Sequence, residues 1–186
     1  MGITVPDVNR RGFLGAIGKA ALIGSAALLT PKVLHAHGSS WWHGLSQMSR
    51  NQAIVDATAP WMGGYGGSCK DWARTVVQTA SKYHVAIPST KAAPDDYRWE
   101  YDPNRNVITD SMCRLLENAP TGWIVQMKLR SGMPHTAIIA GKMSQSVLFV
   151  DSNWDLDGRV QTHLMSYSDF YNKLWRTWSY TLYYVV

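Results

Sequence analysis

The chain has 186 residues and a formal net charge of +5, from 18 basic and 13 acidic residues. Residues 1–36 hold four of the basic residues and one of the acidic ones, so 14 basic and 12 acidic residues remain after them, a net charge of +2. So small an excess, without any lysine or arginine stripe, gives no electrostatic case for nucleic-acid binding, and we expect no nucleic-acid partner. The remaining 150 residues are a normal size for one domain, and we expect domains at 1–36 and 37–186.

Residues 1–36 have the features of a sorting signal. Asn9-Arg10-Arg11-Gly12-Phe13-Leu14 resembles the twin-arginine export motif, and a modest apolar run, 16–29, follows it. That run is too short and too weakly apolar for a stable membrane span, and Leu34-His35-Ala36 offers a small-residue cleavage site. We expect export of the folded protein by the twin-arginine translocation machinery and a periplasmic or secreted location. An amphipathic helix opening a cytosolic domain is the alternative.

The next informative segment is a glycine-rich turn followed by a cysteine. Gly63-Gly64-Tyr65-Gly66-Gly67 is incompatible with a regular element, whereas apolar residues at 69, 72, 73, 76, 77 and 80 predict a helix over 69–80. Ser68 is the expected N-cap. Cys69 would then lie in the first turn, where the helix dipole favours a thiolate and where free N–H groups can hold an oxyanion. A buried cysteine that only packs on a helix face is the alternative.

The connection between His84 and Val107 is long and aromatic. Tyr97, Trp99 and Tyr101 alternate within a proline-bounded stretch, and long ordered connections often carry binding residues, so we expect these three to line a substrate groove. The aspartates there lack the regular spacing of a calcium loop, and we expect no metal and no other cofactor.

The second cysteine, Cys113, falls in a segment, 109–118, whose apolar residues predict a short amphipathic helix. An exported chain with two cysteines also suggests a disulfide bond. A Cys69–Cys113 bond would exclude Cys69 as a nucleophile, so it is the alternative most damaging to a catalytic interpretation.

Three strands are predicted between residues 123 and 150. They cover 123–129, 135–140 and 147–150, with a turn before His135 and a tight connection at 141–146. In a hairpin register, the end of the third strand returns to the level of His135. Asp151 and Asn153 follow that strand and share a face by the period of two, so both are expected to approach the imidazole.

The C-terminal region predicts a helix and a last strand. Ser166-Tyr167-Ser168-Asp169 has the pattern of a helix start, and 179–186 is rich in aromatic and β-branched residues and should lie inside a sheet. We expect an α+β fold, in which leading helices that include Cys69 pack on an antiparallel sheet of about five or six strands, with the cleft between them.

These pieces together resemble the CHAP amidohydrolase/peptidases, a papain-like group related to the NlpC-type cell-wall hydrolases. The matching segments are 67–72, 122–126, 134–139 and 150–154. The resemblance implies a papain-like fold with Cys69 as nucleophile, His135 as base, and Asp151 or Asn153 as the residue that orients the imidazole. The family more usually has glutamate where Asp151 stands, and Gly122-Trp123 replaces a typical Gly-Asp pair.

The expected reaction is acyl transfer by a cysteine hydrolase, of the peptidase or N-acetylmuramoyl-L-alanine amidase type, acting on an amide bond of peptidoglycan. The backbone N–H of Cys69 and the Tyr65 hydroxyl are candidate oxyanion donors, although Tyr65 also fits a hydrophobic cover on the glycine turn. Trp154 joins the groove candidates. A protease, transacylase or deamidase acting on proteins is the first alternative, and a non-catalytic wall-binding domain is the second.

Overall fold

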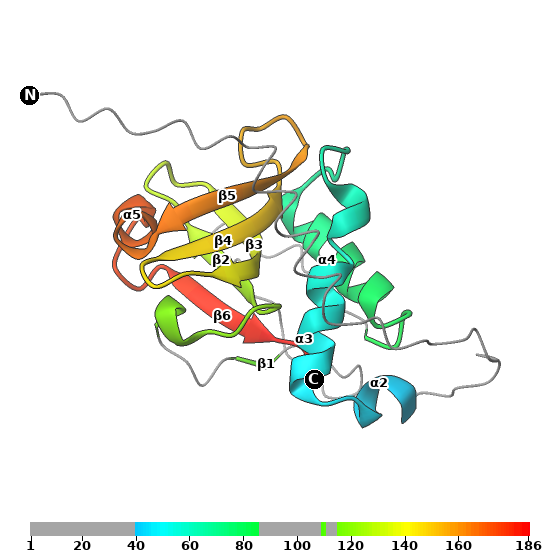
Figure 1. Cartoon of the computed structure of the whole chain (residues 1–186). Coiled ribbons are helices and arrows are strands. Elements are labelled where there is room, and N and C mark those ends of the chain that lie inside the picture. The colour runs from blue at the N-terminus through cyan, green and yellow to red at the C-terminus, as the bar shows by residue number, and fades with distance from the viewer. Residues whose placement is uncertain (1–39, 86–108, 111–114) are drawn as a thin grey trace, which may run out of the picture. The chain divides into compact units, whose positions relative to one another are not determined.

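The computed structural model describes residues 40–85, 109–110 and 115–186, all within one compact unit, Gly38–Val186 (Figure 1). The expected export signal, the groove candidates Tyr97, Trp99 and Tyr101, and Cys113 lie outside the described residues. None of the described helices is both long enough and apolar enough to cross a membrane.

Among the described residues, three α-helices and one short 3-10 helix precede β1 (Thr109–Asp110). They are α2 (Ser40–Gly44), α3 (Gln47–Asp56), η1 (Ala59–Trp61) and α4 (Cys69–Ala80). The prediction of a helix over 69–80 is confirmed, and so is its N-cap, because the Ser68 hydroxyl accepts a hydrogen bond from the Asp71 backbone N–H.

Six antiparallel strands form one sheet in the order β1-β6-β2-β3-β4-β5. Their bounds are β1 (Thr109–Asp110), β2 (Ile124–Lys128), β3 (Pro134–Lys142), β4 (Ser146–Ser152), β5 (Val160–Ser166) and β6 (Tyr180–Tyr184). The expected α+β class and the antiparallel sheet are therefore confirmed. The last strand lies inside the sheet, between β1 and β2, as its apolar character indicated.

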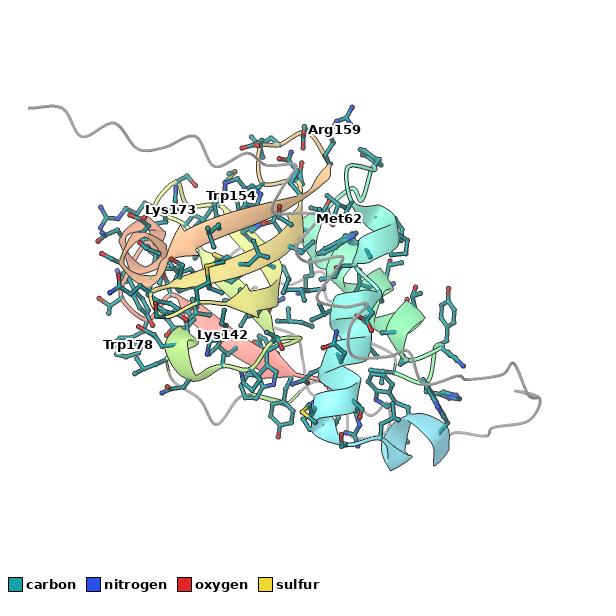
Figure 2. The ribbon with its side chains drawn as sticks, in the orientation of Figure 1. Met62, Lys142, Trp154, Arg159, Lys173 and Trp178 are labelled. Atoms are coloured by element: carbon teal, nitrogen blue, oxygen red, sulfur yellow. The ribbon has the colours of Figure 1, made fainter. Side chains whose placement is uncertain are left out.

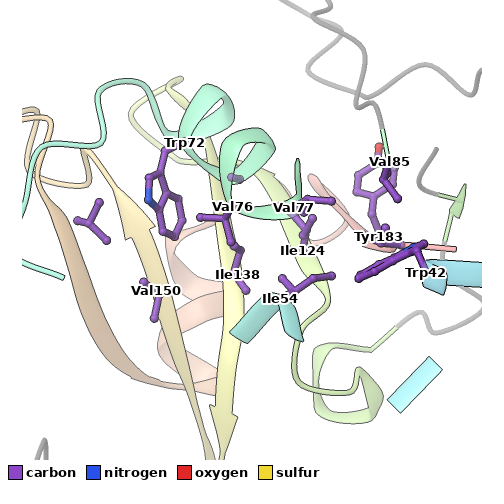
Figure 3. Packing of buried hydrophobic residues seen from close by; sticks show 13 residues of the cluster. Trp42, Ile54, Trp72, Val76, Val77, Val85, Ile124, Ile138, Val150 and Tyr183 are labelled. Carbon is purple, nitrogen blue, oxygen red and sulfur yellow. The ribbon is translucent and has the colours of Figure 1, made fainter. Parts of the chain in front are cut away.

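The alternation of side chains along the strands divides the core into two clusters. Ile124, Ile138 and Val150 pack with Trp72 and Val76 of α4 on one face of the sheet, and Figure 3 shows these side chains facing one another. Neighbouring strand residues, such as Val125, Ala137 and Phe149, point to the other face and pack with Phe170 of α5 (Tyr167–Lys173). Figure 1 shows α5 away from α3 and α4, which agrees with this division.

Two parts of the chain differ from the sequence-based expectation. The helix predicted over 109–118 is wrong at its two described ends, because Thr109 and Asp110 pair with β6 and Leu116–Asn118 forms the 3-10 helix η2. The sequence analysis also missed β5, which pairs with β4 along its whole length. The predicted C-terminal helix is confirmed as α5, with Ser166 as its N-cap and Lys173 as its last residue.

Candidate active site

Cys69 is the first residue of α4, and the preceding glycines allow that helix start to lie against the sheet. The backbone N–H of Gly66 donates to the Gly158 carbonyl. A Cβ at Gly66 would come within 2.6 Å of the Ser152 hydroxyl, so only glycine fits there. The Ser152 hydroxyl in turn donates to the Gly67 carbonyl at 2.8 Å. The end of β4 is therefore tied to the backbone two residues before Cys69.

His135 and Asp151 are brought together by the pairing of β3 with β4. Asp151 lies opposite Ala137, so His135 is its diagonal neighbour on the same face of the sheet. Nε2 of His135 lies 3.4 Å from Oδ1 of Asp151. Asp151 is completely buried and His135 is only 5% exposed, so this contact is made away from bulk water.

The electrostatics of the pair favour a charged histidine. Burial lowers the pKa of His135, but its contacts with the Asp151 carboxylate and the Cys69 sulfur raise it to about 9. Burial likewise raises the pKa of Asp151, and the contacts with His135 and His163 hold it below its ordinary value. The sulfur, the imidazole and the carboxylate therefore form one connected group, in which Cys69 is a buried thiol and not half of a disulfide bond.

His163 is the site residue that the sequence analysis missed. Its Nε2 lies 3.5 Å from Oδ2 of Asp151, so the carboxylate contacts two imidazoles. His163 is the diagonal neighbour of Asp151 on β5, as His135 is on β3. An available signal was composition, since the β-branched residues Val160 and Thr162, followed by Leu164 and Met165, are typical of a strand.

Trp154 covers both histidines. Its ring centroid lies 4.8 Å from that of His135 in an edge-on arrangement and 4.9 Å from that of His163 in a tilted stack. The Lys173 ammonium lies 5.9 Å from the centroid of the same indole. Figure 2 shows Trp154 and Lys173 on the same side of the domain. The expected groove residue is therefore in contact with the imidazole expected to act as base.

Asn153 and Tyr65 have other described contacts. Asn153 has a positive φ of 66°, which takes it out of the strand, and its Oδ1 accepts the Gly158 backbone N–H at 2.8 Å. The expectation that Asp151 and Asn153 share a strand face is therefore wrong, since the period of two ends with β4 at Ser152. The Tyr65 ring lies against Gly158, where a Cβ would meet it at 2.3 Å, and is 76% exposed.

The site has no arrangement of ligands for a cation within the described residues. No three histidine, cysteine or acidic side chains of that part of the chain are placed to hold a metal ion. The described groups in contact are a thiol, an imidazole whose pKa is raised, and a buried carboxylate.

Comparisons with known proteins connect this chain to others by its fold alone. No protein-family model matches the sequence, and no curated protein matches it significantly. Two solved structures are similar, "The crystal structure of Ly7917" (TM-score 0.50, 15% identity) and "The crystal structure of Ly7917 with the hydrolyzing product of MDP" (TM-score 0.51, 13% identity). Each match covers 73% of this chain, which spans 62% and 63% of the length of those structures. The fold of this domain is thus similar to that of Ly7917.

Proposed function

We propose that this protein is a papain-like cysteine hydrolase that cleaves an amide bond of peptidoglycan, with Cys69 as nucleophile and His135 as proton donor and acceptor. The observation that carries the proposal is the connected group of Cys69, His135 and Asp151 at the start of α4. A thiolate is stabilised there by the helix N-terminus and by an adjacent imidazolium, which are the two features that activate a cysteine.

In the acylation step, the Cys69 sulfur forms a bond to the carbonyl carbon of the substrate. The carbonyl electron pair moves to oxygen, and the backbone N–H of Cys69, at the positive end of the dipole of α4, is the proposed donor to that oxyanion. The carbon–nitrogen bond then breaks, and the His135 imidazolium gives its proton to the leaving amine. A thioester and a free amine are the products of this step.

In the deacylation step, water attacks the thioester carbon and gives a proton to the neutral His135. The carbon–sulfur bond breaks, the thiolate returns beside the imidazolium, and the carboxylic acid product leaves. One water is consumed for each amide bond cleaved. Asp151 contacts Nε2 of His135 throughout, so the other ring nitrogen is the one available for proton transfer.

The choice of peptidoglycan has two supports. The segments around Cys69, His135 and Asp151 resemble the CHAP amidohydrolase/peptidases, whose substrates are cell-wall amides. The similar structure of Ly7917 contains the hydrolyzing product of MDP, a peptidoglycan fragment. A hydrolase with this substrate has to reach the cell wall, so we also propose that residues 1–36 direct export and that R10K/R11K traps the protein in the cytoplasm.

The proposed function is tested by incubating peptidoglycan sacculi with the purified protein and with Cys69→Ala, and by identifying released fragments by mass spectrometry. The expected result is fragments with a new amine end for the unaltered protein and none for C69A. Inert sacculi together with cleavage or deamidation of an added protein would move the assignment to the protein-directed alternative. If the sacculi stay inert and Cys69 is alkylated at the rate of an ordinary thiol, the assignment of this protein as a cysteine hydrolase is overturned.

A further inference from the structure

The Asp151 carboxylate has a second imidazole neighbour that the proposed reaction does not use. His135 contacts Oδ1 at 3.4 Å and His163 contacts Oδ2 at 3.5 Å, both through Nε2. The two histidines belong to the strands on either side of β4, and the side chain of Asp151 between them is completely buried. Each carboxylate oxygen therefore has one histidine.

This symmetry matters because a buried carboxylate needs a donor at each oxygen. A carboxylate oxygen without a donor, away from water, costs free energy that the side chain can avoid by rotating or by taking up a proton. Either response would weaken its contact with His135. Nε2 of His163 lies 3.5 Å from Oδ2 and is placed to supply that donor, although neither atom has a hydrogen bond within the described residues.

The His163 ring is itself held in place. Trp154 stacks on it with the ring planes at 32°, and the same indole meets His135 edge-on at 88°. A single aromatic ring thus fixes the positions of both imidazoles relative to the carboxylate. Among the described residues, Cys69 of α4 contacts His135, and the ammonium group of Lys173 of α5 faces the Trp154 indole.

We propose that His163 is a positioning residue, which donates from Nε2 to Oδ2 of Asp151 and so keeps the carboxylate directed at His135. The inference rests on the proposed function, because His135 matters here as the proton carrier of that reaction. It adds a fourth residue to the group of Cys69, His135 and Asp151. His163 acts through Asp151 and does not touch the reacting atoms.

The expected consequence of losing His163 is a fall in the pKa of His135. Without the second donor the Asp151 carboxylate can rotate away from His135 toward another donor, so the imidazolium of His135 loses part of its counter-charge. We expect the pKa of His135 to fall from about 9 by roughly one unit in His163→Leu. In His163→Gln, whose amide nitrogen reaches about the place of Nε2, most of the shift should be kept.

The test is an NMR titration of the His135 ring in the full chain, carried out on the unaltered protein, H163L and H163Q. Thr162→Val, on the next residue of β5 and on the opposite face, controls for disturbance of the strand. The expected result is a lowered pKa in H163L alone, with kcat reduced about tenfold and KM unchanged. An unchanged or raised pKa in folded H163L, or an equal fall in H163Q, would overturn the inference.

The NMR measurement of the His135 pKa does not depend on the substrate. If sacculi are inert but the pKa of His135 falls in H163L and is kept in H163Q, the positioning role stands and the peptidoglycan assignment fails. If sacculi are cleaved but H163L titrates like the unaltered protein, the assignment stands and the positioning role fails. Circular dichroism and thermal melting of each variant establish that it is folded.

Discussion

Oδ1 of Asp151 lies 3.4 Å from Nε2 of His135, whereas Oδ1 of Asn153 accepts a hydrogen bond from the backbone of Gly158. The two residues were equal candidates for orienting the imidazole, and their contacts now separate them. We expect D151N to lower kcat about 100-fold, because the amide cannot stabilise the imidazolium that both reaction steps use. Steady-state kinetics on a soluble amide fragment of peptidoglycan would measure it.

The matched control for that prediction is N153A. Its loss of the Gly158 hydrogen bond should lower the free energy of unfolding by about 1 kcal/mol and leave kcat within about threefold. N153G, which accommodates the positive φ without the side chain, should be at least as stable as N153A. A 100-fold loss of kcat in N153A beside a mild D151N would reverse the two roles.

The pKa of His135 gives a second prediction, on pH. Its pKa is raised from 6.5 to about 9, so the imidazolium proton needed by the leaving amine persists through neutral pH and is lost near pH 9. We expect kcat/KM to fall about tenfold per unit above that pH. A flat profile from pH 8 to 10.5 would contradict the assignment of His135 as proton donor.

The same shift makes stability depend on pH in a definite direction. Because the folded-state pKa of His135 is raised, its contribution to the free energy of unfolding is complete below pH 6.5 and is lost as the pH rises to about 9. Urea unfolding between pH 6 and 9 should therefore show decreasing stability, and His135→Gln should remove that part of the slope. The pKa of Asp151 is lowered, so its contribution is lost only in acid, as the pH falls below 3.8.

Trp154 was expected to line the substrate groove, and its contacts with both histidines give it a second role that kinetics can separate. An aromatic contact of this kind is worth about 0.5–1.5 kcal/mol, so W154A should lower kcat by up to about tenfold if the indole mainly holds the imidazoles. W154F, which keeps a ring over His135, should retain most of kcat. A change confined to KM would instead assign Trp154 to substrate binding alone.

The sequence predicted those site residues that follow from local patterns. The helical spacing after Ser68 located Cys69 at a helix start, and the hairpin pattern brought Asp151 to His135. Both features depend on residues close together in the chain, where period and turn chemistry are informative. Local patterns do not determine which strands that are distant in the sequence pair with one another.

His163 and Asn153 show why the rest of the site could not be predicted from the sequence. The role of His163 depends on the pairing of β5 with β4, a tertiary contact whose register is visible only once both strands are placed. The period of two failed at Asn153 because the backbone turns there into a positive φ, stabilised by the Gly158 hydrogen bond. Thr109 and Asp110 belong to a segment whose apolar spacing predicted a helix, yet their pairing with β6 overrides that local preference.

Two glycines with a positive φ provide a matched test of how closely α3 packs against the entry to β2. Gly122 (φ 79°) lies where a Cβ would come within 2.3 Å of the Asn51 carbonyl oxygen of α3, whereas nothing lies within 4 Å of a Cβ at Gly132 (φ 84°). G132A should therefore lose only the conformational penalty, about 1–2 kcal/mol. G122A carries the same penalty and also forces α3 away from the strand entry, because the colliding atoms are backbone atoms that no rotamer change can move. We expect G122A to lose about 3 kcal/mol or more in urea unfolding, and equal losses in the two variants would show that α3 does not pack closely at Gly122.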